Sequence, residues 1–249
     1  SASPLWDADG WIVPRPGGAR QDGYLFADGG DFARPLREFV RLAGRIPMPP
    51  RAVLGAWFST YWPFSSRDYL AILRRFQREG MPLDFLVLDV DWHTNGWQGF
   101  DWNRRLIPHP DGFLRKARAL GVRISANDHP SGPFLPRDSR YDEVCRRLGW
   151  DGERIPRTEI PEMHLVPAPV RRLAARARRR PIAFTLSRRG EAEAFMEVLH
   201  EPLRRQGVDV WWVDGQARSD VPGLDPMAWT NHVFRDGTER ASGATTWIN

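Results

Sequence analysis

Short apolar runs alternate with longer amphipathic stretches along most of this chain. Four runs, 51–59, 83–92, 122–130 and 208–215, are apolar enough to predict buried strands. The stretches between them place apolar residues at helical spacing, and several end in a glycine that can close a helix. Because strands buried on both faces and alternating with helices are typical of parallel sheets, we expect an α/β fold.

The expected helices differ in how clearly they are bounded. A stretch beginning near Ser65 or Ser66 has a capping serine and a stop at Gly80. Three further helices are expected within the segments DGFLRKARALG, YDEVCRRLGW and EAEAFMEVLHEPLRRQG. The run 179–187 (RRPIAFTLS) is ambiguous between strand and loop.

The first 31 residues have a different character from the rest. They are rich in Gly and Asp with short apolar pieces, which predicts short strands and turns. A helix follows, with apolar residues at helical spacing and a stop at Gly44. We therefore expect residues 1–31 to be the tail of a β-rich module, and residues 32–249 to form the main domain.

Composition and charge narrow the classes of protein. The net charge is +5, but the arginines are scattered among acids, so nucleic-acid binding is disfavoured. The single cysteine, Cys145, excludes an intramolecular disulfide. No apolar window approaches a membrane span, so the simplest expectation is a soluble, cytoplasmic protein without a membrane partner. The sequence leaves oligomerisation open.

Polar residues gather just after the predicted strands. They are Ser59, Asp89 with Asp91, Asn127 with His129, and Asp214. In a (β/α)8 TIM barrel this edge of the sheet forms the active-site face. A Rossmann-type sheet is disfavoured because GAWFSTYWPF lacks the glycine-rich phosphate loop. We expect a TIM-barrel type fold with about four βα units, the first half of a barrel.

The acids at these strand ends are the main candidates for chemistry. Asp89 and Asp91, separated by one residue, would point the same way at the end of an extended strand. Their carboxylates suit sugar hydroxyls, and the following loop, WHTNGWQGFDWN, is rich in aromatic and amide side chains. Asp214 ends an apolar run, where a buried charge requires a partner or a function. For Asp89 and Asp91 the alternative role is helix capping or ion pairing, and for Asp214 it is capping of the following turn. Asp209, at the other end of that run, is interpreted as structural.

Other kinds of site lack support. His129 is as readily a structural histidine as a functional one, and the six histidines show no metal-ligand grouping. No serine has the G-x-S-x-G context of a serine hydrolase. An aldolase or amidohydrolase barrel would need a strand-end lysine or a His-x-His pair, whereas the only lysine, Lys116, lies in a predicted helix. We expect no metal and no cofactor.

Taken in order, several segments resemble glycoside hydrolase family 31, the α-glucosidase and α-xylosidase family. The segments are PMPPRAVLGAWFSTYW, MPLDFLVLDVDWH, GWQGFDWNRRLIPHPDGFL, NDHP, GVDVWWVDGQ and GLDPMAWTNH. The resemblance is closest to a bacterial branch and runs from about residue 10 to about residue 235. It implies that residues 1–31 are the end of the β-sandwich-like module that precedes the family's catalytic barrel.

The resemblance also implies roles for individual residues. Asp214 matches the catalytic nucleophile, and Asp89 matches the acid that binds sugar hydroxyls in the first subsite. Trp212 matches a tryptophan that lines this subsite, and further substrate contacts are expected from four residues at matching loop positions. These are Asp91, Trp92, Asn127 and His129. The implied reaction is retaining hydrolysis of α-linked glycosides, in which the two catalytic carboxyl groups lie about 5–5.5 Å apart.

The family's acid/base aspartate follows a later strand, and no match to it is found in this chain. We therefore expect the chain by itself to be weak or inactive, because general acid catalysis contributes about 10²–10⁴-fold. The main alternative is a carbohydrate-binding remnant without turnover. In either case the expected partner is a carbohydrate.

Overall fold

The computed structural model describes residues 7–13, 24–44, 48–150, 155, 164, 166–176, 179–215 and 218–242. The chain forms two compact units, Ser1–Pro50 and Arg51–Asn249. In the first, helix α1 (Ala33–Ala43) confirms the helix expected before Gly44, whose φ of 84° ends it. Much of the predicted β-rich segment lies outside the described residues, so the proposed boundary at residue 31 stays a prediction.

The second unit is built on one parallel sheet, as the alternating pattern predicted. Its strands are β1 (Trp57–Phe58), β2 (Phe85–Leu88), β3 (Arg123–Asp128) and β4 (Val210–Val213). They lie side by side in the order β1-β2-β3-β4, and every neighbouring pair is parallel. This order is that of successive βα units, which confirms a partial TIM-barrel type fold.

Two strand predictions need correction. The run 83–92 does not stay extended to its end: β2 stops at Leu88, and a 3-10 turn, η2 (Val90–Trp92), follows. Asp89 and Asp91 therefore lie beyond the strand, and the argument from strand alternation does not apply to them. The run 51–59 likewise begins with a 3-10 turn, η1 (Arg51–Leu54). The ambiguous run 179–187 contributes only isolated bridges, through Ile182 and Thr185.

Each helix that the sequence predicted is present close to its expected position. Helix α2 (Ser66–Arg78) begins with a capping box in which the Ser65 hydroxyl and the Asp68 carboxylate accept each other's backbone N–H. The remaining helices are α3 (Pro110–Ala119), α4 (Tyr141–Leu148), α5 (Ala168–Arg176), α6 (Arg189–Ala194), α7 (Glu201–Gln206) and α8 (Pro226–Ser242). A π-helical turn, η4 (Phe195–His200), joins α6 to α7, so the predicted 191–207 helix is continuous but not regular.

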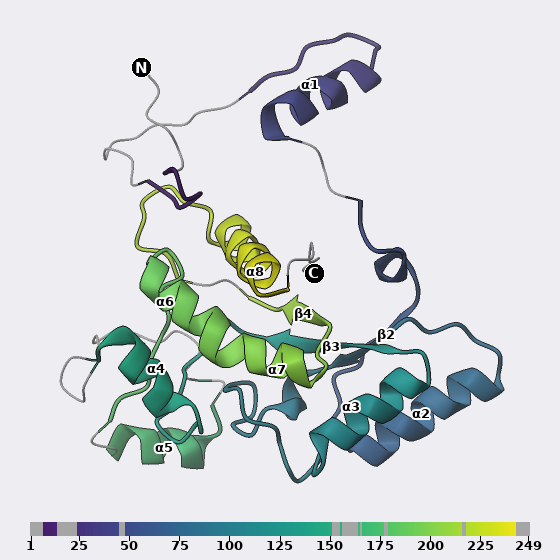
Figure 1. Cartoon of the computed structure of the whole chain (residues 1–249), viewed down its shortest axis with the longest axis vertical. Helices are drawn as coiled ribbons and strands as arrows, with labels where there is room; N and C mark the ends of the chain where they lie inside the picture. Colours follow the sequence, from purple (N-terminus) through teal and green to yellow (C-terminus); the bar gives the residue numbers. More distant parts are fainter. Residues whose placement is uncertain are drawn as a thin grey trace. The chain divides into compact units, whose positions relative to one another are not determined.

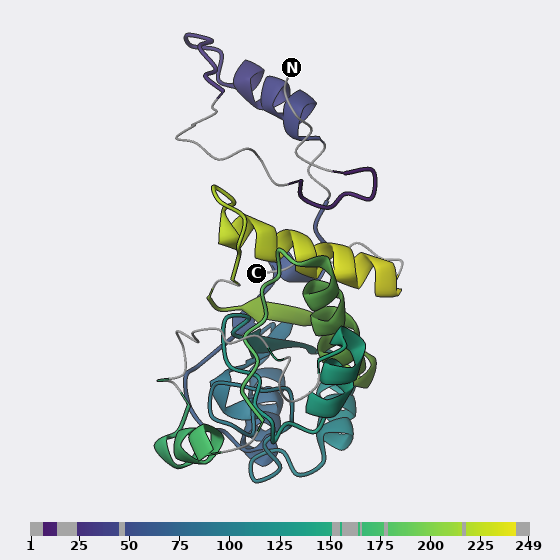
Figure 2. The same cartoon turned by 90° about the vertical axis from the view of Figure 1, so that its left-hand side faces the viewer.

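The helices form a layer that follows the order of the strands. Helix α2 contacts α3, α3 contacts β3 and α7, and η4 contacts both α4 and α8. Figures 1 and 2 show the α6–α7 run lying along the sheet beside β4, with α8 next to it. Leu86, Leu88 and Ala126 in the two central strands are fully buried, so the core lies between this layer and the sheet. No helix in the described part of the chain is both long and apolar enough to cross a bilayer.

Candidate active site

The carboxyl ends of the last three strands lie at one edge of the sheet. Leu88 is paired with Ala126, and Asp128 is paired with Val213. The residues that follow β2 and β4, and those that end β3, are therefore neighbours. The structure brings Asp89, Asn127, His129 and Asp214 to the same edge, as predicted.

Asp214 is the first residue beyond β4, and its side chain is 56% exposed. Its backbone N–H donates to the Asp128 carbonyl at 2.8 Å, which continues the β3–β4 ladder by one residue. The Asn127 side-chain amide donates to Asp214 Oδ2 at 3.3 Å, and His129 Nε2 lies 3.9 Å from the same oxygen. The carboxylate is thus oriented by neighbours and still open to an incoming molecule.

Asn127 and Trp92 were expected to contact substrate, but both are only 2% exposed. The Trp92 indole N–H donates to the Asn127 carbonyl at 2.9 Å, and Asn127 in turn donates to Asp214. Burial of both side chains leaves little surface for a sugar. Asn127 supports the Asp214 carboxylate and Trp92 supports Asn127, while their contact with substrate stays a prediction.

A row of aromatic rings leads away from Asp214 through His129. The His129 ring lies 5.4 Å from Trp97, and Trp97 makes an edge contact with Tyr61 at 5.6 Å. Tyr61 is 64% exposed, so the row reaches solvent. The sequence pointed to the loop that carries Trp97 because of its composition, but it did not single out Trp97 or Tyr61.

Asp89 and Asp91 lie close enough to influence each other. Burial raises the pKa of Asp91, and the negative charge of Asp89 raises it further. Burial is also the main cause of a raised Tyr69 pKa, to which both carboxylates add. Both aspartates are half-buried, so water screens the charges of their carboxylates only partly.

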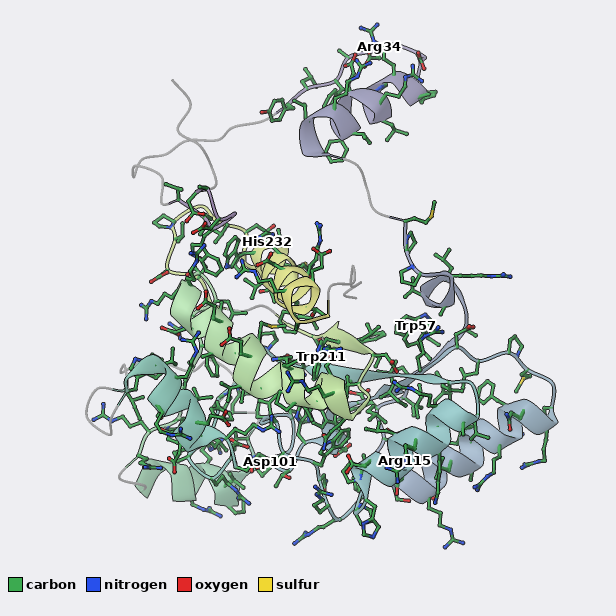
Figure 3. The ribbon with its side chains drawn as sticks, in the orientation of Figure 1. Arg34, Trp57, Asp101, Arg115, Trp211 and His232 are labelled. Carbon is green, nitrogen blue, oxygen red and sulfur yellow. The ribbon has the colours of Figure 1, made fainter. Side chains whose placement is uncertain are left out.

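Trp212 is half-buried in β4 and meets Trp57 of β1 edge-on at 6.4 Å. Trp57 stacks on Phe85 at 4.0 Å, which fixes its plane; Figure 3 labels it beside the sheet. The sequence did not identify Trp57 as a site residue. An aromatic side chain in the first strand was its only signal.

The loops around the site are held by a buried polar network. His93 Nδ1 donates to the Gly99 carbonyl at 2.6 Å, and burial lowers the pKa of His93 to about 4. Asp138 accepts from the Leu135 backbone and from the Asn95 amide, and burial raises its pKa to about 7. This network ties the loop after β2 to the loop after β3.

The described carboxylates that follow Asp214 are mostly engaged elsewhere. Asp220 pairs with Arg188 and Ser187, Asp225 accepts from the first backbone amides of α8, and Asp236 pairs with Arg240. None was a candidate acid/base from its sequence context. Within the described residues, no group of three metal-ligating side chains is close enough to hold an ion.

Comparison with known proteins agrees with this geometry. The model of the glycosyl hydrolases family 31 TIM-barrel domain matches residues 46–242. Alpha-glucosidase 2 of Bacillus thermoamyloliquefaciens is 26% identical over 146 residues, which cover 56% of this chain and 18% of that protein. Alpha-xylosidase XylQ of Lactiplantibacillus pentosus is 27% identical over 92 residues, covering 36% and 12%. The chain thus spans less than a fifth of the length of these relatives.

Solved structures show the same fold. A family 31 dextranase of Flavobacterium johnsoniae superimposes with a TM-score of 0.63 at 14% identity, over 89% of this chain and 28% of that one. The family 31 alpha-xylosidase of Xanthomonas citri gives 0.61 at 19% identity, over 86% and 24%. With most of the second unit matched by the family model and the strand order of successive βα units, the chain belongs to glycosyl hydrolase family 31 and carries part of its TIM-barrel domain.

Proposed function

We propose that this chain carries the nucleophile side of a retaining α-glycosidase site, with Asp214 as the nucleophile. The observation that supports this most directly is the position of Asp214. It is an exposed carboxylate at the carboxyl end of a parallel strand, held by an amide donor and next to a histidine. In barrel enzymes this edge of the sheet is where catalytic groups lie.

The Asn127 amide suits a nucleophile, because its hydrogen bond holds the Asp214 carboxylate in one orientation. In the proposed reaction an Asp214 oxygen attacks the anomeric carbon, and the bond from that carbon to the leaving oxygen breaks. The leaving oxygen takes a proton from a general acid. Water then loses a proton to the conjugate base of that acid and attacks the anomeric carbon of the covalent glycosyl–enzyme. The bond to the Asp214 oxygen breaks, and the sugar leaves with its configuration retained.

The other residues at this edge divide into two groups. Asp89 and Asp91 would accept hydrogen bonds from sugar hydroxyls, while Trp212 and His129 would line the same subsite. Asn127 and Trp92 would hold Asp214 and the end of β3 in place. The general acid/base is not assigned to any residue of these 249.

The substrate class proposed is an α-linked glucoside or xyloside. The support is the names of the relatives, which include alpha-glucosidases and alpha-xylosidases. The half-buried Trp212 and Trp57 offer apolar faces of the kind on which sugar rings pack.

Covalent trapping tests this proposal without requiring full turnover. The purified chain is incubated with activated 2-deoxy-2-fluoro α-glucosyl and α-xylosyl donors, whose good leaving groups reduce the need for a general acid. Intact mass and peptide mapping then follow. We expect one adduct per chain, on the peptide that contains Asp214.

Two other outcomes would contradict the assignment. An adduct on another carboxylate would show that Asp214 is not the nucleophile. A folded chain that binds sugar in calorimetry but forms no adduct would favour the carbohydrate-binding remnant instead.

A further inference from the structure

A buried ionisable pair lies directly behind the candidate nucleophile. Asp128 Oδ2 is 2.7 Å from His200 Nε2, and both side chains are 2% exposed. His200 Nδ1 is 2.9 Å from the Phe195 carbonyl. Burying a charged or strongly polar pair this deeply costs free energy of folding unless hydrogen bonds satisfy both groups.

The partners of His200 restrict where its protons lie. A carbonyl oxygen can only accept, so Nδ1 must carry a proton and donate to Phe195. The remaining nitrogen then either donates to the Asp128 carboxylate or accepts from its acid form. In both cases one proton lies between His200 and Asp128, and the bond is strongly directional.

The surroundings of His200 hold its ring in one orientation. Four aromatic rings lie around it, with centroids at 4.4–5.0 Å: Phe100, Phe195, Trp211 and Phe234. Trp211 is labelled in Figure 3. Ring contacts at these distances pack against the imidazole and restrict its rotation.

The π-helical turn explains how a helix residue reaches the strand. His200 ends η4 and bonds, through its ring, to the carbonyl five residues before it. Such wide turns displace one residue from the regular helical path and often occur near functional sites. Here the displaced region is the part of the α6–α7 run that faces the end of β3.

Asp128 connects this pair to Asp214. Its side chain bonds His200 on the helix side of the sheet, while its carbonyl accepts the Asp214 backbone N–H at 2.8 Å. Its neighbour Asn127 points to the opposite face and donates to the Asp214 carboxylate. One anchored strand end therefore sets both contacts that orient Asp214.

We propose that His200 is a positioning residue for Asp214 and acts through Asp128. The catalytic consequence rests on the function proposed above, whereas the structural consequence does not. Loss of the His200 contact would free the end of β3, weaken the Asp128–Asp214 backbone bond and misplace the carboxylate.

Two variants separate the pair's geometry from its charge. His200→Leu keeps a similar volume but leaves Asp128 buried without its partner. Asp128→Asn keeps the bond in neutral form, because its amide can donate to the free ring nitrogen of a neutral His200. Asp138→Asn is the matched control, since Asp138 is also a buried carboxylate but bonds Leu135 and Asn95 instead.

The first measurement is amide hydrogen exchange by NMR on the full chain. The β3–β4 pair has its own internal reference, because the Asp209 N–H bonds the Ile124 carbonyl at 2.8 Å at the opposite end of the sheet. In His200→Leu we expect exchange at Asp214 to accelerate about tenfold more than at Asp209. In Asp128→Asn and Asp138→Asn the two amides should change together.

The second measurement is the rate of trapping by the fluoroglycoside. His200→Leu should lower the maximal trapping rate about tenfold or more with little change in the donor concentration for half-maximal rate, and Asp128→Asn should stay within about threefold of wild type. Equal acceleration of both amides in His200→Leu, or an unchanged trapping rate, would overturn the positioning role. If wild type is not trapped, the proposed function fails, and the exchange experiment still decides the role of His200.

Discussion

Asp209 and Asp214 stand at opposite ends of the same strand and have opposite surroundings. Asp209 is 25% exposed, and its carboxylate pairs with Arg118 at 2.8 Å and accepts the Ile124 backbone N–H at 2.9 Å. Asp214 is 56% exposed, and among the described residues its side-chain hydrogen bond comes from the Asn127 amide at 3.3 Å. The first carboxylate has its hydrogen bonds supplied by the fold, whereas the second has capacity left for a ligand.

This difference follows the polarity of a parallel sheet. All four strands point the same way, so one edge collects their amino ends and the other their carboxyl ends. In barrels the amino edge serves stability and the carboxyl edge serves function. The two edges should therefore respond differently to substitution and to pH.

The largest expected effect is on covalent trapping. Asp214→Ala should reduce the trapping rate about 10³-fold or more, because the attacking oxygen is lost. Its free energy of unfolding should change by only about 0.5 kcal/mol, because the side chain is largely exposed. Mass spectrometry measures the trapping rate, and urea denaturation measures the free energy of unfolding. An adduct that still forms in Asp214→Ala would contradict the functional difference between Asp214 and Asp209.

The next effect is a pH dependence at the functional edge. Burial raises the pKa of Asp138 to about 7, whereas the pKa of this group in the unfolded chain is near 4. The contribution of Asp138 to stability is therefore complete below about pH 4 and is lost as the pH rises through about 7. Asp138→Asn removes this term, on the order of a few kcal/mol. The stability of wild type relative to the variant should therefore fall between pH 4 and 7.

His93 acts in the opposite direction over much of this range. Its pKa is lowered to about 4, so its contribution is present above 6.5 and is lost as the pH falls through about 4. In Asp138→Asn the His93 trend is no longer offset, and stability should rise from pH 4 to 6.5. Thermal unfolding across this range measures both slopes, and parallel curves for the two proteins would contradict the assignment.

At the structural edge, Asp209→Ala should lower the free energy of unfolding by about 1–3 kcal/mol. The loss leaves the Ile124 N–H without its acceptor and Arg118 without its partner. The trapping rate of the folded protein should stay near that of wild type. If trapping fell as far as in Asp214→Ala, Asp209 would not be a purely structural residue.

The smallest effect separates the two partners of Asp209. Arg118 is 60% exposed, so Arg118→Gln should cost only about 0.2–1 kcal/mol. The backbone bond to Ile124 would remain. Comparison with Asp209→Ala by urea denaturation gives the share of each contact, and an equal loss in both variants would mean that the ion pair dominates.

The sequence predicted the parts of this molecule that depend on local periodicity. The apolar runs identified all four strands, and Ser65 and Gly44 marked ends of helices correctly. It also predicted that Asp89, Asn127, His129 and Asp214 share one edge, because strand order alone brings them there. It was wrong about the local path of Asp89 and Asp91, where a 3-10 turn replaces the strand.

Side-chain burial was the main feature that the sequence did not reveal. Trp92 and Asn127 have the chemistry of sugar-binding residues, but packing buries both side chains. His200 carried no signal in the sequence, since its role depends on a π-helical turn and on a partner 72 residues away.

The sequence by itself determined the class of fold, the order of its elements and the edge at which polar groups gather. These follow from backbone hydrogen bonding and the periodicity of apolar residues, which are properties of short segments. Only the tertiary structure decided which polar side chains remain open and which are buried, and how the end of β3 is anchored. Those features depend on contacts between segments far apart in the chain, and local patterns do not encode such contacts.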